Sequence, residues 1–172
     1  YTIEGGDVLV LRPEPGATAT MERARRLGLD PLAIPLFEIV PLAWEPPDAA
    51  QFDALLLTSA NAVRYGGEAL QSLRGLPVHA VGEATASAAR ETGFDIASHG
   101  DCDVERLLDS IASDLKLLHL CGEHRTGIRG PEQSITAIPV YRAEERDVSL
   151  QPDQVGGAIP LVHSPRPARP FA

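Results

Sequence analysis

Several residue types that would indicate particular protein classes are scarce in this sequence of 172 residues. Two cysteines, Cys102 and Cys121, are too few for a disulfide framework, so a reducing, cytoplasmic location is expected. Aromatic residues make up only 5% of the chain, which excludes stacking on bases or flat cofactors as a widespread binding strategy. The longest apolar stretch, residues 32–44, is interrupted by Glu38 and by prolines, so no segment is expected to span a bilayer.

Positive charge is also scarce, because 15 Lys and Arg face 24 Asp and Glu and give a net charge of −9. This balance argues against a general nucleic-acid-binding or anionic-membrane surface, although it is compatible with a local basic pocket. The common catalytic signatures are missing too: the sequence has no Gly-rich dinucleotide fingerprint, Walker loop, nucleophile elbow or HExxH. The function therefore has to be sought in how individual residues are arranged.

Short apolar runs alternate with amphipathic segments along the chain. Strands are expected at residues 7–11, 31–42, 53–57, 78–81, 117–120 and 135–142, and helices at residues 17–27, 59–73, 84–92 and 104–113. This alternation predicts an α/β fold with open parallel sheets and helices on both faces. Ligands of such sheets usually bind beyond the carboxyl ends of the strands, which here carry Arg12, Thr58-Ser59, Gly82, Cys121-Gly122 and His163-Ser164.

Two Pro-rich extended stretches, residues 31–47 and 135–142, are interpreted as a paired connector. They divide the chain into an inner domain, residues 48–135, and a discontinuous outer domain built from residues 1–40 and 140–172.

Histidine and cysteine cluster between residues 99 and 124, which raises the question of a metal site. The most suggestive group is His119, Cys121 and His124, of which the first two share one face of a strand. Their spacing does not match the paired ligands of a zinc site, so a strand end followed by a loop is the preferred interpretation and no metal is expected.

Ser and Thr at strand ends carry more information. Ser59 opens a helix and is first of all an N-cap, and Thr85 is expected to serve similarly. The same geometry directs backbone amides and the positive end of a helix dipole at any anion in the crevice. One such site is only a cap, whereas three facing one cleft would form a polyanion receptor.

Five segments, taken together and in register, resemble the uroporphyrinogen-III synthases. They are VLVLRPEPG at residues 8–16, FDALLLTSANAV at 52–63, VHAVGEATA at 78–86, IPVYRA at 138–143 and VHSPR at 162–166. The resemblance implies two flavodoxin-like α/β domains joined by a two-stranded connector, with the active site in the cleft between them. It also implies a monomeric, cofactor-free enzyme that closes hydroxymethylbilane into uroporphyrinogen III, inverting ring D and losing water. The upstream bilane-forming enzyme is an expected transient partner.

The resemblance also suggests roles for individual residues. Tyr141 matches the tyrosine at the end of the connector strand and would donate a hydrogen bond to the departing hydroxyl; the alternative is an aromatic residue that only packs at the domain junction. The positions expected to bind the substrate's carboxylates are Arg12, Thr58, Ser59, Gly82, Thr85 and Ser164. Arg12 after a strand is also compatible with a solvated surface charge.

The chain departs from the family pattern at its C-terminal end. The family's outer domain continues past the Ser-Pro motif through two more β-α units, whereas this sequence stops at Ala172, so the outer domain is expected to be incomplete. Two hypotheses therefore stand: a cyclising lyase, and a non-catalytic α/β module that binds an anionic tetrapyrrole or a similar ligand.

Overall fold

The structure is a computed structural model that describes residues 8–100, 103–124, 127–128, 133–148 and 159–161. The chain divides into two compact units, one formed by residues 1–39 with 144–172 and the other by residues 40–143. The two covalent links between the units, at residues 39–40 and 143–144, fall within strands β3 (Phe37–Pro41) and β8 (Ser134–Glu145).

The first unit contains a three-stranded parallel sheet and one helix. The strands β1 (Val8–Val10), β2 (Pro31–Ala33) and β9 (Ile159–Leu161) lie in the order β2-β1-β9, and α1 spans Gly16–Arg26. Val8, Val10 and Ala17 form the buried core between sheet and helix. The helix predicted at residues 17–27 is confirmed within one residue, and Gly28 beyond its end adopts φ +79°.

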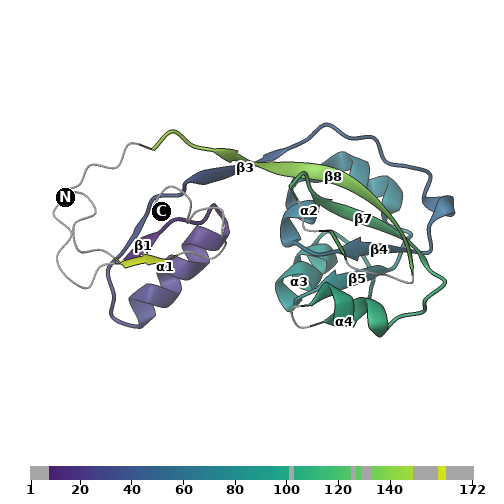
Figure 1. The fold of residues 1–172 in the computed structure, drawn as a ribbon, viewed down its shortest axis with the longest axis horizontal. Coiled ribbons are helices and arrows are strands. Elements are labelled where there is room, and N and C mark those ends of the chain that lie inside the picture. Colours follow the sequence, from purple (N-terminus) through teal and green to yellow (C-terminus); the bar gives the residue numbers. More distant parts are fainter. Residues whose placement is uncertain (1–7, 101–102, 125–126, 129–132, 149–158, 162–172) are drawn as a thin grey trace. The chain divides into compact units, whose positions relative to one another are not determined.

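The second unit is built around a six-stranded sheet in the order β3-β8-β7-β4-β5-β6. Figure 1 labels β8, β7, β4 and β5, which follow one another across this sheet. Its remaining strands are β4 (Ala54–Leu57), β5 (Val78–Val81), β6 (Ile96–Gly100) and β7 (Lys116–Gly122). All pairs from β8 to β6 are parallel, as predicted. The Leu42 N–H donates to the Val140 carbonyl and the Arg146 N–H to the Leu36 carbonyl, so β3 runs antiparallel to β8.

The helices of the second unit are α2 (Ala60–Tyr65), α3 (Glu83–Glu91), α4 (Val104–Asp109) and the 3-10 segments η1 (Ala49–Gln51) and η2 (Glu68–Leu73). The single helix predicted over residues 59–73 is wrong. It breaks at Gly66-Gly67, where Gly67 adopts φ +68°, a conformation that other residues rarely adopt and that an α-helix cannot continue through. The helix predicted over residues 104–113 ends at Asp109, and β6 lies in a stretch where no strand was predicted.

Helices cover both faces of the six-stranded sheet, as the sequence predicts. Leu55 and Leu57 of β4 belong to the cluster that packs against α2, η2 and α3, whereas Ala54 and Leu56 belong to the cluster that packs against α4. Alternate residues therefore enter opposite cores, which explains why these strands are apolar at successive positions. Among the described residues, none of the helices combines the length and apolar character needed to cross a membrane.

Candidate functional site

Ser59, Gly122 and Tyr141 lie close together at one side of the second unit's sheet, where β4 and β7 reach their carboxyl ends beside β8. Below, this side is called the carboxyl edge of the sheet. These strands are neighbours in the sheet, and their parallel registers align Leu57 with Leu120 and Leu120 with Ile138. The residues that follow these positions therefore emerge side by side. Of the residues expected to act on a ligand, this edge brings Ser59 and Tyr141 into contact.

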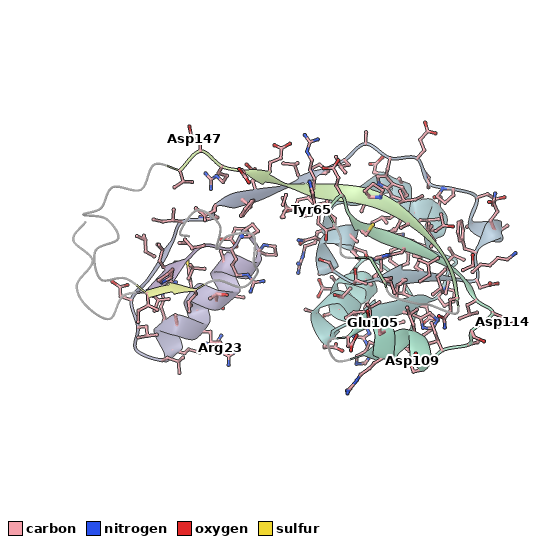
Figure 2. The ribbon with its side chains drawn as sticks, viewed as in Figure 1. Arg23, Tyr65, Glu105, Asp109, Asp114 and Asp147 are labelled. Carbon is pink, nitrogen blue, oxygen red and sulfur yellow. The ribbon has the colours of Figure 1, made fainter. Side chains whose placement is uncertain are left out.

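Tyr141 is partly buried in a seat made by three neighbours. Its phenol hydrogen-bonds the Ser59 side chain, and the backbone of Gly122 lies directly against its ring. The ring of Tyr65, labelled in Figure 2 at the end of α2, has its centroid 6.5 Å from that of Tyr141 and is tilted by 41°. Each contact lies within the second unit, so the seat is complete in residues 40–143.

The protonation state of Tyr141 follows from this seat. Burial is the main influence and raises the pKa of the phenol, the neighbouring Cys121 raises it further, and the Ser59 hydrogen bond opposes the rise. The net direction is upward from 10, so the phenol keeps its proton at neutral pH. Tyr141 is thus a hydrogen-bond donor at this edge of the sheet.

Ser59 has two roles in the structure. Its hydroxyl oxygen accepts a hydrogen bond from the Asn61 N–H at 3.2 Å, which confirms the predicted N-cap of α2. The same side chain reaches Tyr141. Because a cap fixes the side chain against the first turn of its helix, Ser59 offers the phenol a partner whose position is already set.

Thr58 lies on the other face of the sheet from Ser59. Its Oγ1 and the Nε2 of His119 are 3.0 Å apart and share a hydrogen bond, and His119 is only 3% exposed. Thr58 continues the alternation of Ala54 and Leu56, whose side chains face α4. In this structure its hydroxyl holds a buried histidine.

Gly82 and Thr85 follow β5. Gly82 is the N-cap of α3 with φ +82°, and its carbonyl accepts hydrogen bonds from the N–H groups of Thr85 and Ala86, each at 3.1 Å. The capping role expected for Thr85 is wrong, because the helix already begins at Glu83 and Thr85 is its third residue. Thr85 is also 5% exposed, so its side chain packs inside the unit.

Arg12 belongs to the first unit. Its guanidinium lies over Gly16 at the start of α1 and donates to the Thr20 hydroxyl at 3.5 Å. The hydroxyl of Thr20 in turn donates to the Gly16 carbonyl at 3.0 Å, so Arg12 packs along the first turn of the helix. The other candidate after a strand of the outer domain, Ser164, lies outside the described residues.

Tyr65 was not named from the sequence. Gly122 was named only among the strand-end residues and His119 only in the rejected metal cluster, and neither the contact with Tyr141 nor the hydrogen bond with Thr58 was predicted. Gly122 was visible only as a glycine directly after an apolar strand. A pocket of about 320 Å³ elsewhere in the unit is lined in part by Val63 and Phe94. Phe94 lies just before the amino end of β6, so this pocket lies toward the amino ends of the strands, whereas Ser59 lies at the carboxyl end of β4.

Comparisons with known proteins point to one family. The family model described as "Uroporphyrinogen-III synthase HemD" matches residues 18–159. Uroporphyrinogen-III synthase from Chlorobaculum parvum is 28% identical over 150 residues, which cover 80% of this chain and 58% of that protein. Porphyrin biosynthesis protein HemD from Ruminiclostridium josui is 28% identical over 103 residues, covering 52% of this chain and 20% of that one.

A solved structure agrees with these matches at the level of the fold. Uroporphyrinogen-III synthetase from Helicobacter pylori 26695 superimposes with a TM-score of 0.56 at 19% identity, covering 84% of this chain and 65% of that one. The chain thus spans less than two thirds of the length of these relatives.

Proposed function

The chain belongs to the uroporphyrinogen-III synthase HemD family, and on this premise we propose that it closes hydroxymethylbilane into uroporphyrinogen III. The observation that carries the proposal is the protonated phenol of Tyr141, which is partly buried and hydrogen-bonded to Ser59 near the carboxyl ends of β4 and β7. A lyase that helps a hydroxyl group to leave needs such a donor, and ligands of parallel sheets bind at this edge.

The proposed chemistry follows from the reactivity of the bilane. The bond between the terminal CH2 and its hydroxyl breaks, the oxygen leaves as water with a proton, and the resulting cation is attacked by a carbon of ring D. The phenol of Tyr141 donates a hydrogen bond to the departing oxygen. Attack by the already substituted α-carbon of ring D forms a spiro intermediate. The bond from that carbon to its original CH2 bridge then breaks, and the released CH2 cation bonds to the free α-carbon of the same ring, which inverts ring D. The proton lost from that carbon when the macrocycle forms balances the proton taken up by the leaving water.

Selectivity for the inverted product needs little energy. The unassisted reaction closes to the uninverted isomer, so the protein has to favour one transition state over another. A tenfold preference corresponds to about 1.4 kcal/mol of differential binding. Restraint of the two ends of the bilane is sufficient for this, because orientation alone contributes several kcal/mol in well-placed reactions.

Recognition of the substrate's carboxylates is proposed to be local, because the net charge of −9 provides no long-range attraction. Ser59 and the backbone at Gly82, where α3 begins, are the proposed contacts in the second unit. Arg12 and Ser164 are the proposed contacts in the first unit. For Thr58 and Thr85 we propose positioning of the strand ends, since both side chains are turned into the unit or hydrogen-bonded there.

The proposal needs no cofactor, because the reaction is a dehydration and ring closure without net oxidation. A cytoplasmic reaction is proposed from the low cysteine content. Because the bilane is unstable, we also propose transient contact between this chain and the enzyme that forms the bilane.

The test is an isomer analysis with bilane generated enzymatically in the same vessel. The chain is expected to raise the type III isomer above the control without protein, and Tyr141→Phe is expected to lower turnover by about a hundredfold, at the lower end of the effect of a general acid. Ser72→Ala removes a hydroxyl from the exposed side of η2 and is the matched control. Type I alone at the spontaneous rate would contradict the proposal. Tetrapyrrole binding without turnover would then favour a non-catalytic binding module.

A further inference from the structure

The ladder between β7 and β8 loses its register by one residue immediately before Tyr141. Cys121 pairs with Pro139 and Gly122 with Tyr141, so Val140 has no counterpart on β7. Such a bulge is rare between parallel strands, and bulges are typically used to re-aim a side chain. The Val140 carbonyl instead accepts a hydrogen bond from Leu42 on the other side, at 3.0 Å.

The bulge places two successive side chains on the same side of the sheet. Val140 is fully buried in the cluster under α2 and α3, and Tyr141 packs against the same cluster. Tyr141 also contacts Ser59 and Tyr65, which lie at the two ends of α2. In a regular strand Tyr141 would point away from Val140, toward the face that α4 covers. The Tyr141 carbonyl is held at this position by the Glu123 N–H, at 2.9 Å.

Gly122 provides the space that the re-aimed ring occupies. A Cβ on Gly122 would lie 2.9 Å from Cε2, 3.0 Å from Cζ and 3.2 Å from the hydroxyl oxygen of Tyr141. Gly122 does not belong to the glycines with positive φ, so its backbone conformation is open to other residues. A Cβ at this position would therefore force the ring and its hydroxyl to shift, without straining the backbone of residue 122 itself.

We propose that Gly122 is a positioning residue which, together with the bulge at Val140, fixes the phenol of Tyr141 beside Ser59. The effect on catalysis acts through Tyr141 and rests on the proposed function. Two features separated by 18 positions in the sequence thus set one hydroxyl: the extra residue turns the side chain to the correct face, and the missing Cβ lets it approach β7.

The test compares Gly122→Ala with Gly75→Ala. The Cβ added at residue 75 meets no atom of the described residues within 4 Å, and the backbone conformation there is equally ordinary. The first readout is the ionisation of Tyr141, followed by ultraviolet difference titration against the same chain carrying Tyr141→Phe. In the wild type and in Gly75→Ala, the phenol should titrate above its ordinary pKa. In Gly122→Ala, displacement from the buried seat should bring the pKa back toward the ordinary value.

The second readout is turnover to the type III isomer. Gly122→Ala is expected to lower kcat by at least about tenfold and to change KM by less than about threefold. The reason is that the displaced group, the phenol of Tyr141, acts on the transition state. Adding Gly122→Ala to Tyr141→Phe should cause little further loss, since both changes disable the same hydroxyl. Gly75→Ala should keep wild-type turnover.

The outcomes separate the two proposals. A wild-type titration in Gly122→Ala, or full turnover in that variant beside an active wild type, would overturn the positioning role. An inactive wild type would contradict the proposed function, and the titration would still decide whether Gly122 positions the phenol. If Gly122→Ala fails to fold, Tyr141→Ala is added to remove the ring: recovery of the fold supports the seat, and continued failure overturns it.

Discussion

The hydrogen bond between Thr58 and His119 makes a sharp prediction, because it separates two roles for the same hydroxyl. The two atoms are 3.0 Å apart, and His119 is 3% exposed, so water has little access to the imidazole. Thr58→Val keeps the shape of the side chain and removes only this partner. Loss of one partner from a buried polar pair costs about 1–3 kcal/mol, so the free energy of unfolding should fall by about that amount.

Urea unfolding followed by circular dichroism measures this change. With a slope of about 2 kcal/mol per molar urea, the midpoint should fall by about 0.5–1.5 M while the slope stays constant. Thr136→Val is the matched control, because Thr136 is exposed on β8 of the same unit. Its effect should stay within about 0.5 kcal/mol.

The contrary result is equally informative. If Thr58→Val leaves stability unchanged and weakens binding of the bilane, then the hydroxyl serves the ligand and the structural assignment of Thr58 is refuted. If stability falls and binding by the remaining folded protein is normal, Thr58 positions the strand end only.

Three further predictions concern stability. Burial lowers the pKa of His79 from 6.5, so the unfolded chain takes up a proton more readily than the folded chain. The contribution of His79 to stability should therefore be intact above pH 6.5 and decline as the pH falls below that value. The His79→Gln variant should lose less melting temperature than the wild type between about pH 7.5 and 5.5. Gln133→Ala removes the amide that donates to one carbonyl in the last turn of α4 and to two just beyond it. This change should cost about 1–3 kcal/mol in urea unfolding, against less than about 0.5 kcal/mol for the exposed Gln71→Ala. Leu118→Ala, at a fully buried position, should cost about 2–5 kcal/mol, whereas Leu27→Ala, at 72% exposure, should be nearly neutral; equal effects in either pair would contradict the burial described.

The strands that could be predicted are those whose sequence alone determines their environment. β4, β5 and β7 are short, largely apolar runs because helices cover both faces of the sheet, and such runs have few alternatives. Gly28 and Gly93, just beyond the ends of α1 and α3, could also be predicted as C-terminal caps. Glycine is the residue that most readily adopts the positive φ found at both positions. Both signals are local and do not depend on residues distant in the sequence.

The elements that were missed depend on partners distant in sequence. Residues 96–100 alternate between partly buried and exposed side chains and contain little apolar surface, so β6 is defined by pairing with β5 at the sheet edge. The double glycine at residues 66–67 was visible in the sequence, but its consequence was not: Gly67 adopts φ +68°, and the 3-10 segment η2 follows with Leu70 and Leu73 in the core. The misassigned cap at Thr85 is a local error of one turn, because α3 begins at Glu83 and its N-cap is Gly82.

The candidate site shows the same division within a few residues. A serine after an apolar run is recognisable as a cap, so Ser59 could be predicted, and a tyrosine in an extended segment is recognisable as a strand residue. The side of the sheet to which Tyr141 points could not be predicted, because strict alternation from Val140 gives the wrong face. Tyrosine at this position is therefore not a sufficient mark of the site. A chain that kept the tyrosine but carried a Cβ opposite it, or lacked the extra residue, would hold the phenol elsewhere, and Gly122 and the bulge must be considered with Tyr141 as one unit.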